Sequence, residues 1–303
     1  MMNVTFRLTL HVTFLVLGLT GNLYILVVNA LDWRKTQHLS ACTTIISSLG
    51  ISNLVLQAAV VINEMCFLIL QSFYSQDSVI NAFGTILVFT FFSSILFSVC
   101  LCFYYFVKIV PFQFLLGNLK SKISKIIPWL LGGSVLFSLI ASVPLHWDLY
   151  RDTKHANISS GNVIESFNFS FASKCQCIFN IYLVLTAIVF VTYLLLCLPI
   201  IISLCKHMQM IKRNLGGTTN LDAHLSAAAT LILLLALYIY LSVALSFVFN
   251  LTKTAGTWFF SFCFLMISSF PSLNSLVLII GNPKLRKPLK KLCITNCCHR
   301  DDT

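Results

Sequence analysis

Seven long stretches of the chain contain no Asp, Glu, Lys or Arg, and these stretches dominate the pattern of polar and apolar positions. Each has between 22 and 31 residues, whereas the next longest uncharged stretch, 65–76, has only 12. A helix needs roughly 20 apolar residues to cross the hydrocarbon core of a bilayer. We therefore predict seven transmembrane helices, near residues 8–31, 38–63, 79–107, 126–147, 178–205, 225–249 and 257–280.

The stretches lack the alternation of apolar and polar residues that marks the strands of a membrane barrel. Lipid cannot satisfy bare backbone groups, so the alternative that remains is the helix. The predicted fold class is an all-α membrane protein, a seven-transmembrane helix bundle. We expect one receptor-like domain over residues 1–283 and a cytosolic tail over 284–303.

Composition agrees with this reading, because 58% of the 303 residues are hydrophobic and only 10% are charged. A soluble domain carries about 25% charged residues. The formal net charge of +11 is the single feature that resembles a nucleic-acid-binding protein. The Lys and Arg residues flank the apolar stretches, however, so they indicate membrane orientation and no nucleic-acid partner is expected.

The distribution of basic residues predicts the orientation of the chain. The first, third and fifth connections together with the tail hold 15 of the 20 Lys and Arg residues. Basic residues favour the cytosolic side, so we expect an extracellular N-terminus and a cytosolic C-terminus. Four Asn-x-Ser/Thr acceptors fall on the predicted outer side. Asn157 and Asn168 are the stronger candidates for glycosylation, and Asn3 and Asn250 lie close to helix ends.

The apolar stretches carry no Asp, Glu, Lys or Arg and only a few His, although pumps and proton-coupled transporters usually place ionisable residues at membrane depth. No spacing typical of a hydrolase, a metalloprotease or a P-loop is present either. We therefore expect no enzyme activity, no catalytic or metal-binding residue and no cofactor. A seven-helix receptor is the favoured class.

Motifs at four helix ends resemble those of the type 2 (bitter) taste receptors, a family of G protein-coupled receptors. They are Gly21-Asn22 in the first stretch, Phe103-Tyr104-x-x-x-Lys108-Ile109, Ser203-Leu204-x-x-His207, and Pro271-Ser272-x-x-Ser275 followed by Gly281-Asn282-x-Lys284-Leu285. The resemblance extends from Gly21 to about Leu292. The chain departs from the family at Asn53, where many members carry Arg, and at Asn274, where many carry His.

The resemblance implies a plasma-membrane receptor that binds small bitter compounds from the extracellular side. It also implies activation of a gustducin-type heterotrimeric G protein and calcium release. Two alternatives remain at this point: a vomeronasal type 1-like pheromone receptor, and a seven-span transporter or accessory protein. The first would lack the Phe-Tyr-x-x-x-Lys-Ile block, and the second usually shows internal repeats.

The family packs together the stretches that contain Asn22, Asn53 and Asn274, so these side chains are expected to hydrogen-bond to one another. Alternatively, each bonds only to backbone or water. The resemblance assigns G protein coupling or switching to these three and to a further set at the cytosolic helix ends. That set comprises Tyr104, Tyr105, Lys108, Ser203, Leu204, His207 and Ser275. Interfacial anchoring is the alternative role for Tyr and Lys at headgroup level.

The family binds its ligands among the outer halves of the third, fifth, sixth and seventh helices. Carried onto this chain, that region offers Ile86, Leu87, Thr90, Tyr182, Tyr240, Phe260, Phe264 and Ile267. These side chains supply apolar area and a few hydroxyls but no carboxylate, so neutral amphipathic agonists are expected. The alternative is that they merely pack the bundle.

The tail places Leu285, Leu289 and Leu292 at helical spacing among basic residues. This pattern is typical of a short amphipathic helix that lies on anionic membrane lipid. Candidate palmitoylation sites follow at Cys293, Cys297 and Cys298, or these are free thiols. On the outer side, a disulfide from Cys66 to Cys175 or Cys177 is conceivable, although three outer Cys define no framework.

Overall fold

The computed structural model describes residues 4–70, 73, 76–110, 113–151, 171–214, 221–250 and 258–289. Within these ranges seven helices are long and apolar enough to cross a membrane. They are α1 (Val4–Thr36), α2 (Ala41–Ile69), α4 (Asp77–Ile109), α5 (Gln113–Ser142), α6 (Gln176–Asn214), α7 (Leu221–Asn250) and α8 (Trp258–Gly281). The predicted seven-helix architecture is confirmed.

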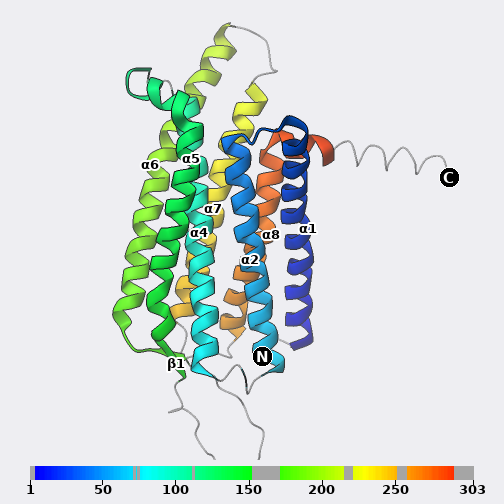
Figure 1. Cartoon of the computed structure of the whole chain (residues 1–303), viewed down its shortest axis with the longest axis vertical. Helices are drawn as coiled ribbons and strands as arrows, with labels where there is room; N and C mark the ends of the chain where they lie inside the picture. Colours follow the sequence, from blue (N-terminus) through cyan, green and yellow to red (C-terminus); the bar gives the residue numbers. More distant parts are fainter. Residues whose placement is uncertain are drawn as a thin grey trace, which may run out of the picture.

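The helices lie side by side along the long axis of the molecule (Figure 1). Helix α4 is the hub of the bundle, since it contacts α2, α5, α6 and α7. The N-terminus lies at the same end as strand β1, and the C-terminus lies at the opposite end (Figure 1). An odd number of passes requires this arrangement.

Most helices continue past the predicted spans, because a charge ends the hydrophobic stretch but does not end a helix. Helix α1 already includes Arg7, and α5 begins at Gln113, well before 126. The second helix is the exception, since it begins at Ala41 and not at 38. The chain turns at Gln37, where φ is 52°, and Ser40 caps the helix by accepting a hydrogen bond from the Thr43 N–H at 3.2 Å.

The fourth helix ends earlier than predicted, at Ser142 and not near 147. One turn of 3₁₀ helix, η1 (Val143–Trp147), follows it and contains Pro144. Strand β1 (Leu149–Arg151) then pairs antiparallel with β2 (Phe171–Ser173), with Tyr150 opposite Ala172. The connection between η1 and α6 therefore starts and finishes in a short two-stranded ladder.

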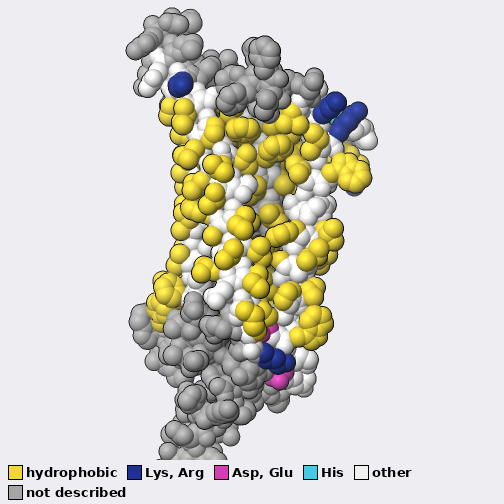
Figure 2. Space-filling model, turned by 90° about the vertical axis from the view of Figure 1, so that its left-hand side faces the viewer, with side chains coloured by type: hydrophobic (Ala, Val, Ile, Leu, Met, Phe, Trp, Pro, Cys, Tyr) yellow, Lys and Arg dark blue, Asp and Glu magenta, His cyan; other side chains and the backbone are white. Residues whose placement is uncertain are grey.

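The outer surface of the bundle is apolar, and its interior holds many polar side chains together with an apolar core. Trp129 is 84% exposed, Leu195 66% and Ile140 64%, whereas Asn22 and Asn53 are fully buried. Figure 2 shows apolar side chains over the middle of one face, with the coloured charged side chains confined to its two ends. This surface suits a hydrocarbon environment.

Small residues let α8 approach its neighbours closely, as in other membrane bundles. A Cβ atom on Gly21 of α1 would collide with the Ser275 side chain of α8. A Cβ atom on Gly281 at the end of α8 would collide with Thr230 of α7. Both positions therefore require glycine for these helix contacts.

Residues 283–289, at the start of the tail, are helical and are attached to α1 and α2. The Lys284 ammonium contacts the Asp32 carboxylate at 2.6 Å and donates to the Thr43 hydroxyl at 3.1 Å. The Tyr24 hydroxyl donates to the Leu285 carbonyl at 2.8 Å. This end of the tail is thus held against the bundle through several polar contacts.

Candidate functional site

Three asparagines from three helices form a fully buried hydrogen-bond network. The Asn53 amide donates to Asn22 Oδ1 at 3.2 Å, and the Asn274 amide donates to Asn53 Oδ1 at 3.1 Å. Ser94 of α4 adds a hydroxyl bond to Asn53 Oδ1 at 3.4 Å. The predicted bonds among the three asparagines are present, and they connect α1, α2 and α8 with α4.

The network also reaches the backbone where proline interrupts α8. The Asn22 amide donates to the Gly18 carbonyl at 2.8 Å and to the Pro271 carbonyl at 3.2 Å. Proline lacks an N–H, so Pro271 cannot bond to the Ile267 carbonyl one turn before it in α8. Among the described residues, Asn274 Oδ1 has no hydrogen-bond partner. Asn274 lines a cavity of about 10 Å³, comparable with the space of one water molecule.

The predicted coupling residues of the third helix pack at the end of α4 that lies toward the tail. The Tyr104 and Tyr105 rings meet edge to face with their centroids 5.6 Å apart, and the Lys108 ammonium lies 5.8 Å from the Tyr104 centroid. The Tyr105 hydroxyl lies 3.8 Å from the Cys42 sulfur of α2. Lys108 is exposed.

The predicted coupling residues of the fifth helix lie beside this group in part. Leu204 of α6 is buried in an apolar cluster against which Tyr105 of α4 packs. Ser203 is partly buried, and the side chain of His207 lies outside the described part of the structure. Ser275 is buried in α8, and its hydroxyl donates to the Ser272 carbonyl at 2.8 Å. Ser275 thus lies with the Asn residues and not with the Tyr residues.

A cavity of about 120 Å³ lies among α4, α6 and α7, toward the end of the bundle that holds β1. Its walls combine aromatic and aliphatic side chains with an amide and several hydroxyls. The lining residues are Val88, Phe91, Phe92, Phe179, Asn180, Tyr182, Leu183, Thr186, Ser242, Leu245 and Ser246. A pocket with apolar walls and a few polar groups is the usual form of a small-molecule site.

Among the predicted ligand residues whose side chains the structure describes, only Tyr182 lines this cavity. Its hydroxyl donates to the Ala141 carbonyl of α5 at 2.9 Å. The Thr90 hydroxyl bonds to carbonyls of its own helix, at Ile86 and Leu87. The Tyr240 hydroxyl lies 2.9 Å from the Ser269 hydroxyl of α8.

The other predicted ligand residues differ in burial and surroundings. Phe264 and Ile267 are buried in the apolar core, and Leu87 packs against that core. Ile86 is 39% exposed and lies away from the cavity wall. The side chain of Phe260 is outside the described part of the structure. The expected mixture of apolar area and hydroxyls is present, but other residues supply it.

Sequence reasoning missed Asn180, Thr186, Ser242 and Ser246, the polar part of the cavity wall. One signal was available, because Ser242 and Ser246 are one helical turn apart within an otherwise apolar stretch. Polar side chains at this spacing share one face and usually turn toward the interior of a membrane bundle.

A buried ion pair was also missed. The Arg7 guanidinium of α1 contacts both oxygens of Glu64 of α2 at 2.6 Å and donates to Ser261 of α8 at 3.0 Å. His11 Nε2 lies 3.9 Å from Glu64 Oε1. Arg7 and Glu64 border the uncharged stretches, so the sequence predicts that both lie outside the helix bundle. The helices extend past the uncharged stretches, so the two charges meet between them.

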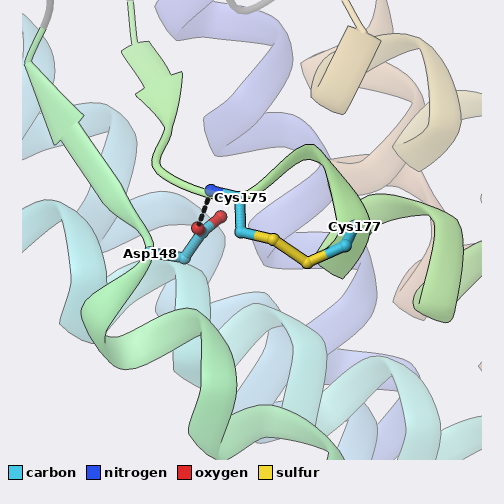
Figure 3. Close-up of a disulfide and its surroundings, with 3 residues drawn as sticks. All are labelled: Asp148, Cys175 and Cys177. Carbon is cyan, nitrogen blue, oxygen red and sulfur yellow. Dashed lines mark hydrogen bonds between the residues drawn. A yellow bond between two sulfur atoms is a disulfide. The ribbon is translucent and has the colours of Figure 1, made fainter.

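The disulfide differs from the Cys66 pairing considered above. Cys175 is bonded to Cys177, while Cys66 is buried and free (Figure 3). The Cys175 N–H donates to the Asp148 carboxylate at 2.9 Å, which ties the end of η1 to the start of α6 (Figure 3). Cys66 belongs to the apolar core around α2 and α4, so it is not available for the bridge.

The modification sites lie almost entirely outside the described residues. This holds for Asn3, Asn157, Asn168, Cys293, Cys297 and Cys298. Asn250 is the last residue of α7, and its side chain is likewise outside the described part.

Comparison with known proteins gives a consistent result over nearly the whole chain. The family model of the taste receptor protein (TAS2R) matches residues 1–296. The taste receptor type 2 member 39 of Macaca mulatta is 30% identical, with 91% of this chain and 82% of the relative covered. The taste receptor type 2 member 40 of Gallus gallus is 28% identical, with 98% of this chain and 97% of the relative covered. The taste receptor type 2 member 8 of Pongo pygmaeus is 28% identical over 93% of this chain and 94% of the relative.

Proposed function

The chain belongs to the taste receptor protein (TAS2R) family, and from this premise we propose that it detects neutral amphipathic bitter compounds in the cavity among α4, α6 and α7. Family membership makes the chain a bitter taste receptor, a multi-pass membrane protein that couples to G proteins and not an enzyme. The observation that carries the proposed ligand site is the cavity with its amide and hydroxyl groups.

The chemistry of the cavity walls favours neutral ligands. Phe91, Phe92 and Phe179 offer aromatic faces, while Asn180 and Ser242 offer hydrogen-bonding groups. Among the described lining residues there is no Asp, Glu, Lys or Arg. A ligand ammonium without a carboxylate partner would lose several kcal/mol of hydration, and cation–π contacts return only about 0.5–2 kcal/mol.

The proposed direction of signalling follows from the predicted orientation. The positive-inside rule places the tail, with most of the basic residues, in the cytosol and the N-terminus outside a plasma membrane. Agonist then binds in the outer half of the bundle, and the ends of α4 and α6 near Tyr105 and Leu204 receive a G protein helix. We propose a gustducin-type G protein as that partner. The basic tail helix would contact anionic lipid of the inner leaflet.

Filling the cavity tests the ligand site. Thr186→Phe places a large ring in the cavity wall of α6, whereas Thr192→Phe places the same ring at an exposed position of the same helix. Cells that express a gustducin-type chimera are exposed to a panel of bitter compounds, and calcium release is recorded. We expect Thr186→Phe to lose at least about tenfold in agonist potency, because overfilling a site costs roughly 1–3 kcal/mol.

Surface expression of both variants is measured in parallel, and the Thr192→Phe receptor should respond like the unaltered chain. Equal potency in all three receptors would place the agonist site elsewhere. The absence of any calcium response from the unaltered chain, with normal surface expression, would instead contradict the assigned ligands or the gustducin-type partner.

A further inference from the structure

A second hollow adjoins the cavity on the outside of the bundle. It has a volume of about 370 Å³ and is lined only by residues of α6 and α7, without a third helix. Four residues belong to both hollows: Leu183 and Thr186 on α6, and Ser242 and Ser246 on α7. Because the cavity continues inward to α4 and the groove does not, the groove opens on the outer face of the bundle.

Small side chains contribute to the lining of the seam between α6 and α7 at this level. Ser242 and Ser246 face Leu183, Thr186 and Ala187 there. Two tyrosine hydroxyls connect the helices, one at the shared residue Thr186 and one further toward the C-terminal end of α6. Tyr238 donates to the Thr186 carbonyl at 2.6 Å, and Tyr193 donates to the Leu231 carbonyl at 3.1 Å. The opening between α6 and α7 is therefore limited in length, and these two hydrogen bonds close it toward the C-terminal end of α6.

The two hollows differ in size and chemistry. Ligand pockets usually measure about 300–1,000 Å³, so the cavity of about 120 Å³ alone is too small for a typical agonist. The groove adds the missing volume. Its outer residues Ile239, Val243 and Phe247 are exposed and apolar. Ser242 and Ser246 line both hollows, whereas the Asn180 amide belongs to the cavity wall and not to the groove.

We propose that the cavity and the groove form one site for a neutral amphiphile with a long apolar tail. The polar head lies in the cavity, and the tail passes between α6 and α7 into the groove, where it meets lipid acyl chains. This inference rests on the proposed function of the cavity as the agonist site. It assigns lipophilic amphiphiles, more than compact polar molecules, as the preferred ligands.

The depth of the groove agrees with this route. Its α6 residues, Leu183 to Phe190, lie about 10–20 Å from the start of α6 at Gln176, given the rise of ~1.5 Å per residue. In the predicted orientation that is the level of the outer leaflet's acyl chains. An amphiphile dissolved in this leaflet therefore reaches the site from the side.

Two photoreactive diazirine alcohols, one with a butyl and one with a dodecyl tail, test the shared site. The purified full chain in lipid nanodiscs is labelled over a range of concentrations, and mass spectrometry maps the labelled residues. The variants Ala187→Trp and Val243→Trp fill the groove without touching the cavity wall. Ile188→Trp, at an exposed position of α6 outside both hollows, is the matched control.

We expect saturable labelling of Val88 and Phe91 in the unaltered chain by both probes. Each groove variant should raise the half-saturating concentration of the dodecyl probe about tenfold, equivalent to ~1.4 kcal/mol. The butyl probe should be unaffected, and Ile188→Trp should change neither. Retained butyl labelling also shows that the variants are folded, and Ala187→Leu provides a milder groove variant if the Trp variants do not fold.

Three results would overturn the inference: no label at the cavity wall, equal loss of both probes, or an unchanged dodecyl response in the folded groove variants. No G protein is present in this measurement. A chain that binds the dodecyl probe as expected but gives no calcium response to agonists would contradict the proposed function alone. A chain that signals normally but shows no groove effect would contradict only the shared site.

Discussion

Asn53 accepts two hydrogen bonds on one oxygen and donates a third with its amide, so it holds α1, α4 and α8 to α2 at one point. Interhelical polar contacts in lipid contribute about 0.6–2 kcal/mol each. Energies of this size correspond to roughly a three- to thirtyfold change in an equilibrium between two helix arrangements. The network is therefore strong enough to bias such an equilibrium and weak enough to be reversed.

Replacement of Asn274 by Leu removes one of these bonds while keeping a side chain of similar size. We expect basal signalling to shift by roughly three- to thirtyfold, with surface expression preserved. Asn29→Leu is the control, because it removes a buried bond from α1 to Ser47 of α2 that lies outside the network. Calcium release without agonist is the measurement. If the Asn274 variant gave the same basal signal and the same agonist-driven signal as the unaltered chain, a switching role would be contradicted.

The Arg7–Glu64 pair yields a prediction about stability. Glu64→Gln leaves the Arg7 guanidinium without its carboxylate, and breaking a buried pair costs about 3–5 kcal/mol. We expect a marked fall in the melting temperature of the solubilised receptor and in surface expression. The double variant with Arg7→Met and Glu64→Leu should recover most of the loss, since no charge is left unpaired. A single variant as stable as the unaltered chain would show that the pair contributes little.

At the scale of the helices, α7 and α8 are in close contact where Gly281 lies against Thr230. In Gly281→Ala the new Cβ atom would overlap the Thr230 side chain, so Thr230 and the α7 backbone that carries it must move away from α8. We expect this movement to destabilise the receptor by about 1–3 kcal/mol. Gly132→Ala is the matched control, because a Cβ atom there meets nothing within 4 Å. That variant should be neutral or slightly stabilising, since alanine favours helix over glycine by ~0.5–1 kcal/mol. Thermal unfolding of the solubilised receptor distinguishes the two, and equal melting temperatures would contradict the close contact.

At the scale of the whole molecule, the seven helices could be read from the sequence because charges are so sparse. The Asn network could also be anticipated, because the family resemblance brings the three stretches together and polar contacts between helices are favourable in lipid. The residues that line the cavity could not be read in this way. In a membrane bundle both the inner and outer faces of a helix are apolar, so periodicity does not distinguish Ile86 from Val88, and only Val88 lines the cavity.

The remaining differences have related causes. Arg7 and Glu64 form an ion pair because α1 and α2 extend beyond the uncharged stretches. A count of charges along the sequence does not reveal how far a helix extends. The disulfide joins two cysteines one residue apart, although the outer position of Cys66 in the sequence made a longer bridge conceivable. Both the ion pair and the disulfide depend on which side chains are close in space, and neither composition nor sequence spacing gives that information.

Among the described residues, α4 is the one helix that contributes both to the cavity, through Val88 and Phe91, and to the Asn network, through Ser94. In the proposed mechanism, agonist binding and G protein binding are therefore linked through the position of helix α4. Thermodynamic linkage requires that the factor by which agonist strengthens G protein binding equals the factor by which G protein strengthens agonist binding. A cell that carries more of the G protein would consequently respond to the same compound at a lower concentration.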